Sequence, residues 1–239
     1  MTGRPSAPRS ERRLVDGVVG RIELAIDHPA GDVAGIACIG HPHPLYGGTL
    51  DNKVASSLAR AFAALGWLAV RPNFRGVGGS DGTHDGGRGE TDDFLHVIDV
   101  VAASADLGGG LPSPAPLALA GFSFGSFVAA SAASRLATGG RAVEHLVLVG
   151  AAAGKWPMPA VGSETLVIHG ENDETIPLSA VFDWARPLGV PVVVIPGADH
   201  FFHRRITLLK DLVLRHVTGS ACRKSAASDA SIDGERQIP

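Results

Sequence analysis

The chain has 239 residues, of which 45% are hydrophobic, 19% charged and 5% aromatic, a composition typical of a globular protein with a large core. A formal charge of −3 gives no strong field of the kind that attracts nucleic acid or anionic membranes. No apolar stretch has the length that a bilayer requires, and Cys38 and Cys222 lack metal-ligand spacing. We therefore expect a cytoplasmic protein without nucleic-acid or membrane partners.

Three parts of the chain differ in composition. Residues 1–13 carry charges with no hydrophobic segment behind them and are interpreted as a flexible leader. Residues 14–218 contain the apolar patterns of one folded domain. Residues 219–239 are small and polar, cannot cover a core, and predict a disordered tail.

The hydrophobic period alternates along the domain between that of a strand and that of a helix. Two short strands are expected within residues 14–26, followed by strands at 33–40, 67–70, 117–120, 146–149, 166–168 and 190–195. Helices are expected at 52–65, 90–105, 124–136, 178–188 and 202–217, the first capped by Asp51 or Asn52. Strands alternating with helices predict the α/β class, with a mostly parallel twisted sheet and helices on both faces.

A Gly-x-Ser-x-Gly pattern, Gly121 to Gly125, lies between an expected strand and an expected helix. Such a turn strains the serine backbone, and its glycines leave room where side chains would collide. It lifts the Ser123 hydroxyl above the sheet and aims the Phe124 amide at an oxyanion. An ordinary turn has the same local pattern, so the hypothesis that Ser123 is a nucleophile depends on partners elsewhere.

An acid and a histidine follow two later strands of the expected sheet. Asp173 comes after the strand at 166–168, and His200 after the strand at 190–195. Because the carboxyl ends of parallel strands share one edge, both are expected near Ser123. The chain order Ser, Asp, His suits a hydrolase in which an imidazole base activates the serine and a carboxylate orients the imidazole.

Other residues compete for these two roles. Glu171 and Glu174 flank Asp173, and a turn-capping role would also explain Asp173 itself. His203 is the rival base, although it lies at the start of the last expected helix.

Five segments together resemble a lidless bacterial branch of the α/β-hydrolase superfamily, related to the dienelactone-hydrolase-like enzymes. They are residues 41–53, 71–82, 121–125, 169–173 and 197–200, within a resemblance that covers roughly residues 14–217. The resemblance implies the α/β-hydrolase fold and esterase-type acyl chemistry, with Ser123, Asp173 and His200 at the triad positions. It favours Asp173 over the neighbouring glutamates. Dienelactone hydrolases proper carry a cysteine nucleophile, so their substrate is not carried over.

The loop after the third expected strand should supply the second oxyanion donor as a backbone amide. Pro42 and Pro44 have no N–H, which leaves His43, Leu45 or Tyr46. Similarity to the His-Gly of related families favours His43. Tyr46, the only tyrosine, is also expected to line the pocket or bind substrate, unless the loop serves only as a stiff turn.

No cofactor is expected. His41 and His43 provide two potential metal ligands without a third. The glycine-rich segment 76–81 lacks the last glycine of a dinucleotide fingerprint, and Lys155 is followed by Trp156 instead of the Ser or Thr of a phosphate loop.

The segment 151–162 is too short to hold the cap domain that many hydrolases insert there, and Trp156 and Met158 within it are expected to form an apolar wall of the substrate site. The predicted function is that of a carboxylesterase-type serine hydrolase, a monomer or homodimer acting on small or accessible acyl esters. A thioesterase, peptidase or acyltransferase with the same triad, or a non-catalytic binding protein, remain alternatives.

Overall fold

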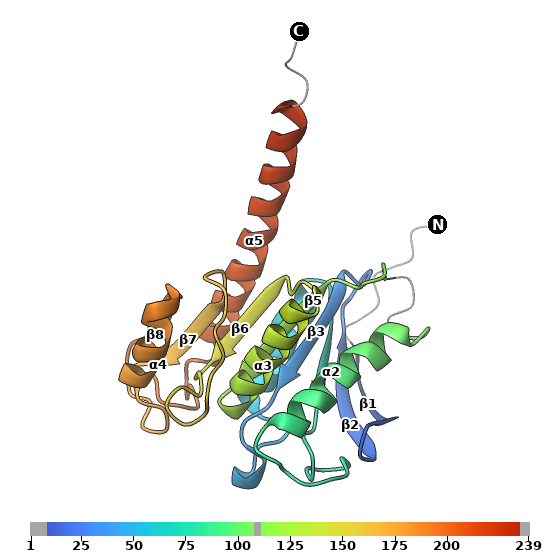
Figure 1. Ribbon diagram of the computed structural model, residues 1–239, viewed down its shortest axis with the longest axis vertical. Coiled ribbons are helices and arrows are strands. Elements are labelled where there is room, and N and C mark those ends of the chain that lie inside the picture. Colours follow the sequence, from blue (N-terminus) through green and yellow to red (C-terminus); the bar gives the residue numbers. More distant parts are fainter. Residues whose placement is uncertain (1–8, 108–110, 235–239) are drawn as a thin grey trace.

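In the computed structural model, the backbone is described for residues 9–107 and 111–234, and side chains as far as Ser220. Eight strands of this part form one sheet in the order β1-β2-β4-β3-β5-β6-β7-β8 (Figure 1). The strands from β3 to β8 run parallel, whereas β2 is antiparallel to both of its neighbours. The expected mostly parallel sheet is confirmed. The strands are β1 Arg9–Asp16, β2 Arg21–His28, β3 Gly35–Gly40, β4 Trp67–Pro72, β5 Leu117–Phe122, β6 His145–Val149, β7 Leu166–Gly170 and β8 Val192–Ile195.

Helices cover both faces of the sheet, as expected. The core on one face includes buried residues of α1 and α5, and the core on the other includes those of α2, α3 and α4. Side chains along a strand alternate between them: Ile36 and Cys38 of β3 belong to one core, and Ala37 and Ile39 to the other. The helices are α1 Lys53–Ala64, α2 Arg88–Ala103, α3 Phe124–Thr138, α4 Leu178–Ala185 and α5 Ile206–Gly234, with short 3-10 helices η1 Pro44–Tyr46 and η2 Arg186–Leu188.

The first strand corrects one predicted boundary. Residues 9–13, which the sequence placed in the leader, lie in β1 and pair with β2 from Arg9 opposite His28 onward. Arg12 bonds Glu23 of β2 at 3.1 Å and Asp51 at 2.6 Å. Because β1 is an edge strand held by backbone pairing and ion pairs, its polar sequence hides it from a search for apolar alternation. Residues 1–8 of the predicted leader lie outside the described part.

The last helix also departs from the expectation. It begins at Ile206, four residues late, because Phe202 and Arg204 adopt positive φ angles of 54° and 60° in the preceding turn. It then continues past Gly219 to Gly234, through a stretch predicted to be disordered. Alanine, lysine and arginine in that stretch have high helix propensity, so the backbone can stay helical without an apolar stripe. Residues 235–239 lie outside the described part. No helix within the described residues is both long and apolar enough to traverse a bilayer.

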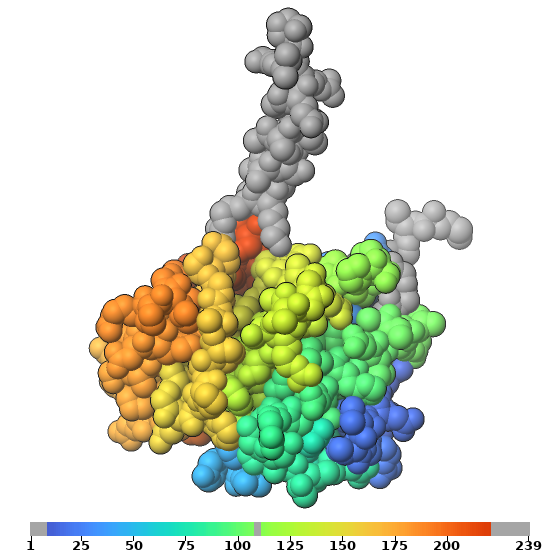
Figure 2. Space-filling model, viewed as in Figure 1, coloured from blue at the N-terminus to red at the C-terminus, as the bar shows by residue number. Residues whose placement is uncertain are grey.

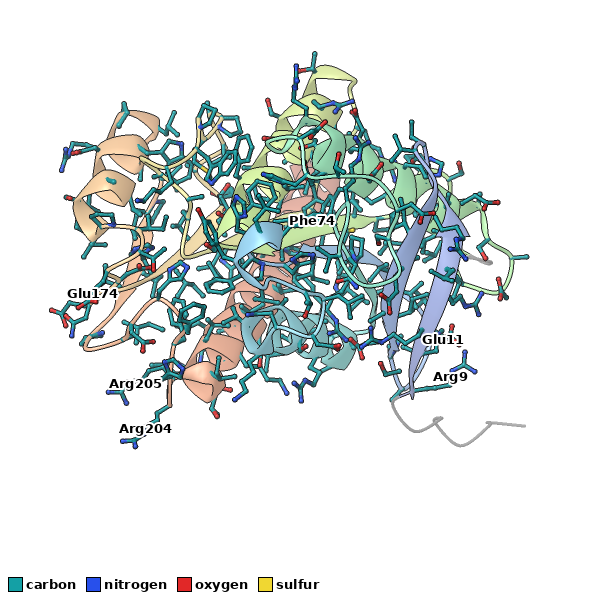
Figure 3. The ribbon with its side chains drawn as sticks, turned by 90° about the horizontal axis from the view of Figure 1, so that it is seen from below. Arg9, Glu11, Phe74, Glu174, Arg204 and Arg205 are labelled. Atoms are coloured by element: carbon teal, nitrogen blue, oxygen red, sulfur yellow. The ribbon has the colours of Figure 1, made fainter. Side chains whose placement is uncertain are left out.

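The loops at the carboxyl ends of the parallel strands gather at one edge of the sheet, which Figure 3 views face on. The segment between β6 and β7, residues 150–165, is fully described and contains no helix, so the expected absence of a cap at this position is confirmed. In the space-filling view this segment, in yellow, lies between α3 and α4 (Figure 2).

Candidate active site

The turn from β5 into α3 holds Ser123 in a strained conformation. Its φ and ψ angles are 54° and −122°, outside the regions that a side chain favours. A Cβ atom on Gly121 would lie 2.0 Å from the Gly125 carbonyl oxygen, and one on Gly125 would lie 2.3 Å from the Gly40 carbonyl oxygen. Both glycines are therefore required, because the turn packs directly against itself and against the end of β3.

The structure brings Ser123, Asp173 and His200 together at the carboxyl edge. The His200 Nε2 atom lies 3.0 Å from the Ser123 Oγ atom, and the His200 Nδ1 atom lies 2.6 Å from the Asp173 Oδ2 atom. An Nδ1–H that donates to the carboxylate leaves the Nε2 lone pair free to accept the serine proton. All three residues are at least nine-tenths buried, so little water competes for these hydrogen bonds.

Asp173 is held as a carboxylate. Its Oδ1 atom accepts hydrogen bonds from the amides of Thr175 at 2.9 Å and Ile176 at 2.7 Å. Burial raises the pKa of Asp173, but the hydrogen bonds from His200 and Ile176 outweigh it, so the net pKa is below the ordinary value. The turn-capping role weighed for Asp173 therefore exists alongside its bond to His200, each using a different oxygen.

The competing acids and base lie elsewhere. Glu171 accepts a hydrogen bond from the Gly197 amide at 2.8 Å, and Glu174 is exposed at the outer edge of the molecule (Figure 3). The His203 Nδ1 atom is bonded to Asp199 at 2.6 Å on the surface. The hydrogen bonds to Ser123 and His200 thus select Asp173 and His200 from the sequence alternatives.

A second histidine, which the sequence analysis missed, contacts the same carboxylate. The Nε2 atom of the fully buried His169 lies 2.9 Å from the Ile176 carbonyl oxygen and 3.4 Å from the Asp173 Oδ2 atom. Burial lowers its pKa, and the bond to the Ile176 carbonyl offsets part of that effect. A histidine inside an otherwise apolar strand, four residues before the acid, was the available signal.

Among the three candidate amides of the loop after β3, hydrogen bonding leaves that of His43 for an oxyanion. The Leu45 amide donates to the His43 Nδ1 atom, and the Tyr46 and Gly48 amides donate to the His43 carbonyl. Within the described part of the chain, no acceptor is found for the His43 amide. Tyr46 is therefore wrong as an amide donor, because its N–H closes the 3-10 turn. Its side chain is 86% exposed, at the rim instead of inside a pocket.

His41 links this loop to the segment that follows β4. Its Nδ1 atom donates to the Pro42 carbonyl at 2.6 Å, and its Nε2 atom accepts from the Phe74 amide at 2.9 Å. Burial lowers its pKa to about 4, and the bond to Pro42 offsets only part of that effect. Both ring nitrogens are thus committed to the backbone. The metal site considered for His41 and His43 is disfavoured on this ground, and no cluster of three or more potential ligands occurs in the described residues.

The other candidate oxyanion donor is the Phe124 amide, which begins α3 and so has no acceptor within the helix, and other rings pack around the Phe124 side chain. The Trp156 ring lies 4.8 Å from the Phe124 ring and 5.6 Å from the His43 ring. Met158, expected beside it, packs on the core of the α2–α3 face. The sequence analysis also missed His84, whose ring lies 5.3 Å from that of Phe124 and whose Nδ1 atom is bonded to the buried Glu90 at 2.7 Å.

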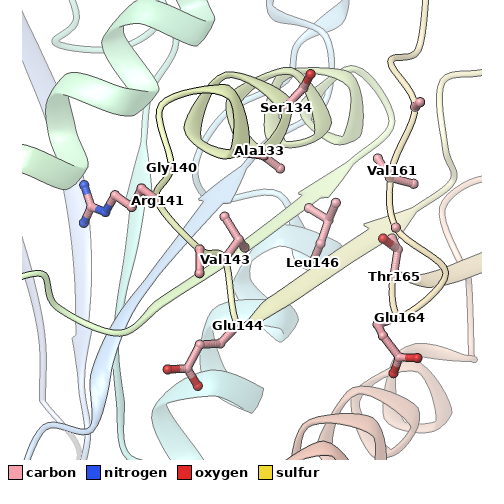
Figure 4. Close-up of a pocket in the computed structure, with 14 residues that line it drawn as sticks. Ala133, Ser134, Gly140, Arg141, Val143, Glu144, Leu146, Val161, Glu164 and Thr165 are labelled. Atoms are coloured by element: carbon pink, nitrogen blue, oxygen red, sulfur yellow. The ribbon is translucent and has the colours of Figure 1, made fainter.

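A hollow of about 410 Å³ lies at the opposite edge of the sheet, where β6 and β7 begin (Figure 4). It is lined by residues at the end of α3 and by residues 160–165, including Ala133, Val143 and Leu146. None of the candidate site residues lines it.

A strained serine at a strand-to-helix turn, hydrogen-bonded to a histidine and an aspartate on an uncapped α/β sheet, defines an α/β serine hydrolase. Comparison with known proteins agrees. The family model described as "Thioesterase domain" matches residues 82–160. The uncharacterized protein RP471 of Rickettsia prowazekii (strain Madrid E) is 32% identical over 203 residues, which span 78% of this chain and 80% of RP471.

Solved structures include two with substantial sequence identity. An α/β serine hydrolase homologue from Coxiella burnetii is 36% identical, covers 86% of this chain and 96% of its own, and superposes with a TM-score of 0.75. XC6422 from Xanthomonas campestris, described as an α/β serine hydrolase without lid, is 36% identical, with coverages of 90% and 96% and a TM-score of 0.76. A dienelactone hydrolase from Anabaena variabilis, 18% identical with coverages of 89% and 98% and a TM-score of 0.67, shares the fold. The chain belongs to the family of lidless α/β serine hydrolases.

Proposed function

We propose that this hydrolase is a carboxylesterase-type enzyme that cleaves small or accessible acyl esters through an acyl-enzyme on Ser123. The observation that carries the proposal is the continuous hydrogen-bonded path from Asp173 through His200 to the Ser123 hydroxyl, with distances of 2.6 and 3.0 Å. A serine hydroxyl is a weak nucleophile until a neighbouring base removes its proton, and this path provides the base and its orienting carboxylate.

In the proposed reaction, His200 takes the Ser123 proton as the oxygen attacks the ester carbonyl. The amides of Phe124 and His43 donate to the tetrahedral oxyanion. Collapse breaks the ester C–O bond, and His200 returns the proton to the departing alcohol. Water, deprotonated by His200, then attacks the acyl group on Ser123. The bond from the acyl carbon to the Ser123 Oγ atom breaks, His200 returns the proton to that oxygen, and the acid is released. Because base, nucleophile and donors are all protein groups, the scheme needs no metal or cofactor.

The surroundings of Ser123 support an accessible substrate. The connection from β6 to β7 has no helix that could close over the serine. Trp156, which is partly exposed and packs on the buried Phe124 ring, offers an apolar surface beside the proposed oxyanion donors. A small acyl group, or the end of a larger ester, can approach such an open site.

A thioesterase is the second candidate, favoured by the family match over residues 82–160. The same nucleophile and donors would act on a thioester carbonyl, with a thiol as the leaving group. Turnover of an ester and a thioester that share one acyl group separates the two functions.

The experiment is hydrolysis of p-nitrophenyl acetate and butyrate by the full chain and by Ser123→Ala. We expect kcat to fall by about 10⁶-fold, as in other triad knockouts. Ser134→Ala, in the same helix but bordering the opposite hollow, serves as the matched control and should keep wild-type turnover. Retention of most activity in a folded Ser123→Ala protein would refute the proposal.

A further inference from the structure

A groove of about 620 Å³ opens beside the turn that follows His200. One wall is the segment from Gly47 to Val54, which leads from the oxyanion loop into α1. The other wall is the turn that follows His200 and includes Phe201, His203 and Arg204. The groove is therefore continuous with the two loops that hold the proposed donor and the proposed base.

The reaction geometry gives this groove a role. A base that takes the serine proton must return it to the leaving group, so the leaving-group atom lies against the His200 imidazole. The Phe201 ring is centred 5.1 Å from the His200 ring, is half exposed, and lines the groove. The rings of Trp156 and Phe124 contact His43 instead, beside the proposed oxyanion donors. The groove thus adjoins the leaving-group side of the site.

Two cations, Lys53 and Arg204, and one carboxylate, Asp51, line the groove, in a chain that as a whole carries −3. Lys53 and Arg204 line it and, within the described residues, form no ion pair. The carboxylate of Asp51, on the same wall, is bonded at 2.6 Å to Arg12, which also pairs with Glu23. Asp199 is bonded to His203 at 2.6 Å.

Arg204 and its neighbour Arg205 extend side by side from the rim into solvent (Figure 3). Exposed side chains change rotamer within nanoseconds, so Arg204 is free to turn toward a bound anion. Arg205 does not line the groove and provides a comparison of equal charge.

We propose that this groove binds the leaving group of an anionic substrate, an alcohol or thiol that carries a carboxylate or a phosphate. Lys53 and Arg204 contact the anion, and Phe201 packs against the apolar part of the same group. In the cleavage step, the bond from the carbonyl carbon to oxygen or sulfur breaks, the acyl group remains on Ser123, and His200 protonates the departing atom. The inference rests on the proposed acyl-transfer function.

The test uses two substrate pairs, each with a common acetyl group. Phenyl acetate and 4-acetoxybenzoate differ by a carboxylate, and S-acetylpantetheine and S-acetyl-4′-phosphopantetheine differ by a phosphate. We expect the double variant Lys53→Gln/Arg204→Gln to lower kcat/KM for the anionic member of at least one pair by roughly five- to tenfold, the size expected when two exposed charge contacts are lost. The neutral members should change by less than about twofold. The pair that responds identifies the anion.

The matched control is Arg205→Gln/Lys210→Gln, which removes the same charge outside the groove. It should leave the ratio of anionic to neutral kcat/KM unchanged, which separates a local contact from the overall field of the protein. Equal losses for anionic and neutral substrates, or the same loss in the control, would overturn the inference.

A binding measurement does not depend on turnover. Calorimetry of the Ser123→Ala protein with 4′-phosphopantetheine and with 4-hydroxybenzoate should show binding that the Lys53→Gln/Arg204→Gln changes weaken. If wild-type enzyme turns over no acyl substrate but this binding is found, the proposed function fails and the anion site stands. If turnover is found and neither anion binds or discriminates, the anion site fails and the proposed function stands.

Discussion

The two edges of the sheet both enclose space, but they are built from different groups. At the carboxyl edge, Ser123, His200, Asp173 and His41 are buried, and each has hydrogen-bond partners fixed in direction. At the amino edge, half of the residues that line the hollow in Figure 4 are alanine, valine or leucine, and none is a histidine. Volume alone therefore does not mark the site. The site is marked by buried polar groups whose hydrogen-bond partners are fixed in direction, because burying a polar group costs free energy unless such partners compensate.

Among the following tests of the contrast between the two edges, the largest effect is expected for a change at Asp173. Asp173→Asn keeps the shape of the side chain but lets it present an N–H to His200, which favours the wrong tautomer. We expect kcat for an ester to fall by about 10⁴-fold. The exposed Asp183 of α4 bonds only Arg186 among the contacts described. Asp183→Asn is therefore the control and should leave kcat unchanged. Activity of Asp173→Asn within tenfold of wild type would contradict the assigned role.

A smaller effect is expected in the pH dependence of stability. His41 has a pKa of about 4 in the folded protein, against an ordinary value of 6.5. Between pH 4 and 6.5 the unfolded chain therefore binds more protons than the folded protein. The contribution of neutral His41 to the free energy of unfolding is complete above pH 6.5 and is lost as the pH falls toward 4. The loss amounts to roughly 3 kcal/mol. Denaturant unfolding should show that the difference in free energy of unfolding between wild type and His41→Asn shrinks as the pH falls from 6.5 to 4.

His96→Asn provides the control for that measurement, because His96 is partly exposed and contacts a carbonyl of β1. Its unfolding free energy should follow the wild-type pH profile. A His41→Asn profile parallel to wild type between pH 4 and 6.5 would show that His41 is not buried in its neutral form.

The smallest effect is expected at the amino edge. Leu146 points into the hollow of Figure 4 and is partly buried. Leu146→Ala should lower the free energy of unfolding by about 1 to 2 kcal/mol through lost packing, while kcat/KM stays within twofold. Thermal melts and ester kinetics on one preparation measure both. A large loss of activity without a loss of stability would mean that this edge communicates with Ser123.

Much of the fold could be predicted because buried parallel strands and amphipathic helices have distinct hydrophobic periods. The strand at 33–40 and the helix at 52–65 are found as β3 and α1, and the Asn52 cap accepts from the Val54 amide. The edge strand β1 was missed before residue 14 because ion pairs and backbone pairing, not apolar alternation, hold it in place. The extension of α5 was missed because it continues without a core-facing pattern.

The site around Ser123 likewise contains residues that could be predicted from the sequence and residues that could not. Ser123, Asp173 and His200 could be placed together because each follows a parallel strand, and topology alone brings such positions to one edge. The contacts of His169 with Asp173 and of His84 with Glu90 depend on side-chain direction. The sequence marks His169 only by its place inside an apolar strand and has no comparable signal for His84. Likewise, only the hydrogen bonds of the loop show that the Tyr46 amide is occupied while that of His43 is open.

The central claim is that the Ser123 hydroxyl is the group activated by His200. Its most direct test is to treat the full chain with a fluorophosphonate and to locate the adduct by peptide mass spectrometry. Ser126, one turn along α3 and buried with its hydroxyl bonded to the Ser123 carbonyl at 2.6 Å, is an internal control. The account predicts one adduct, on Ser123, that is lost when His200 is changed to Asn. An adduct on another serine, or a rate of labelling at Ser123 that does not depend on His200, would contradict it.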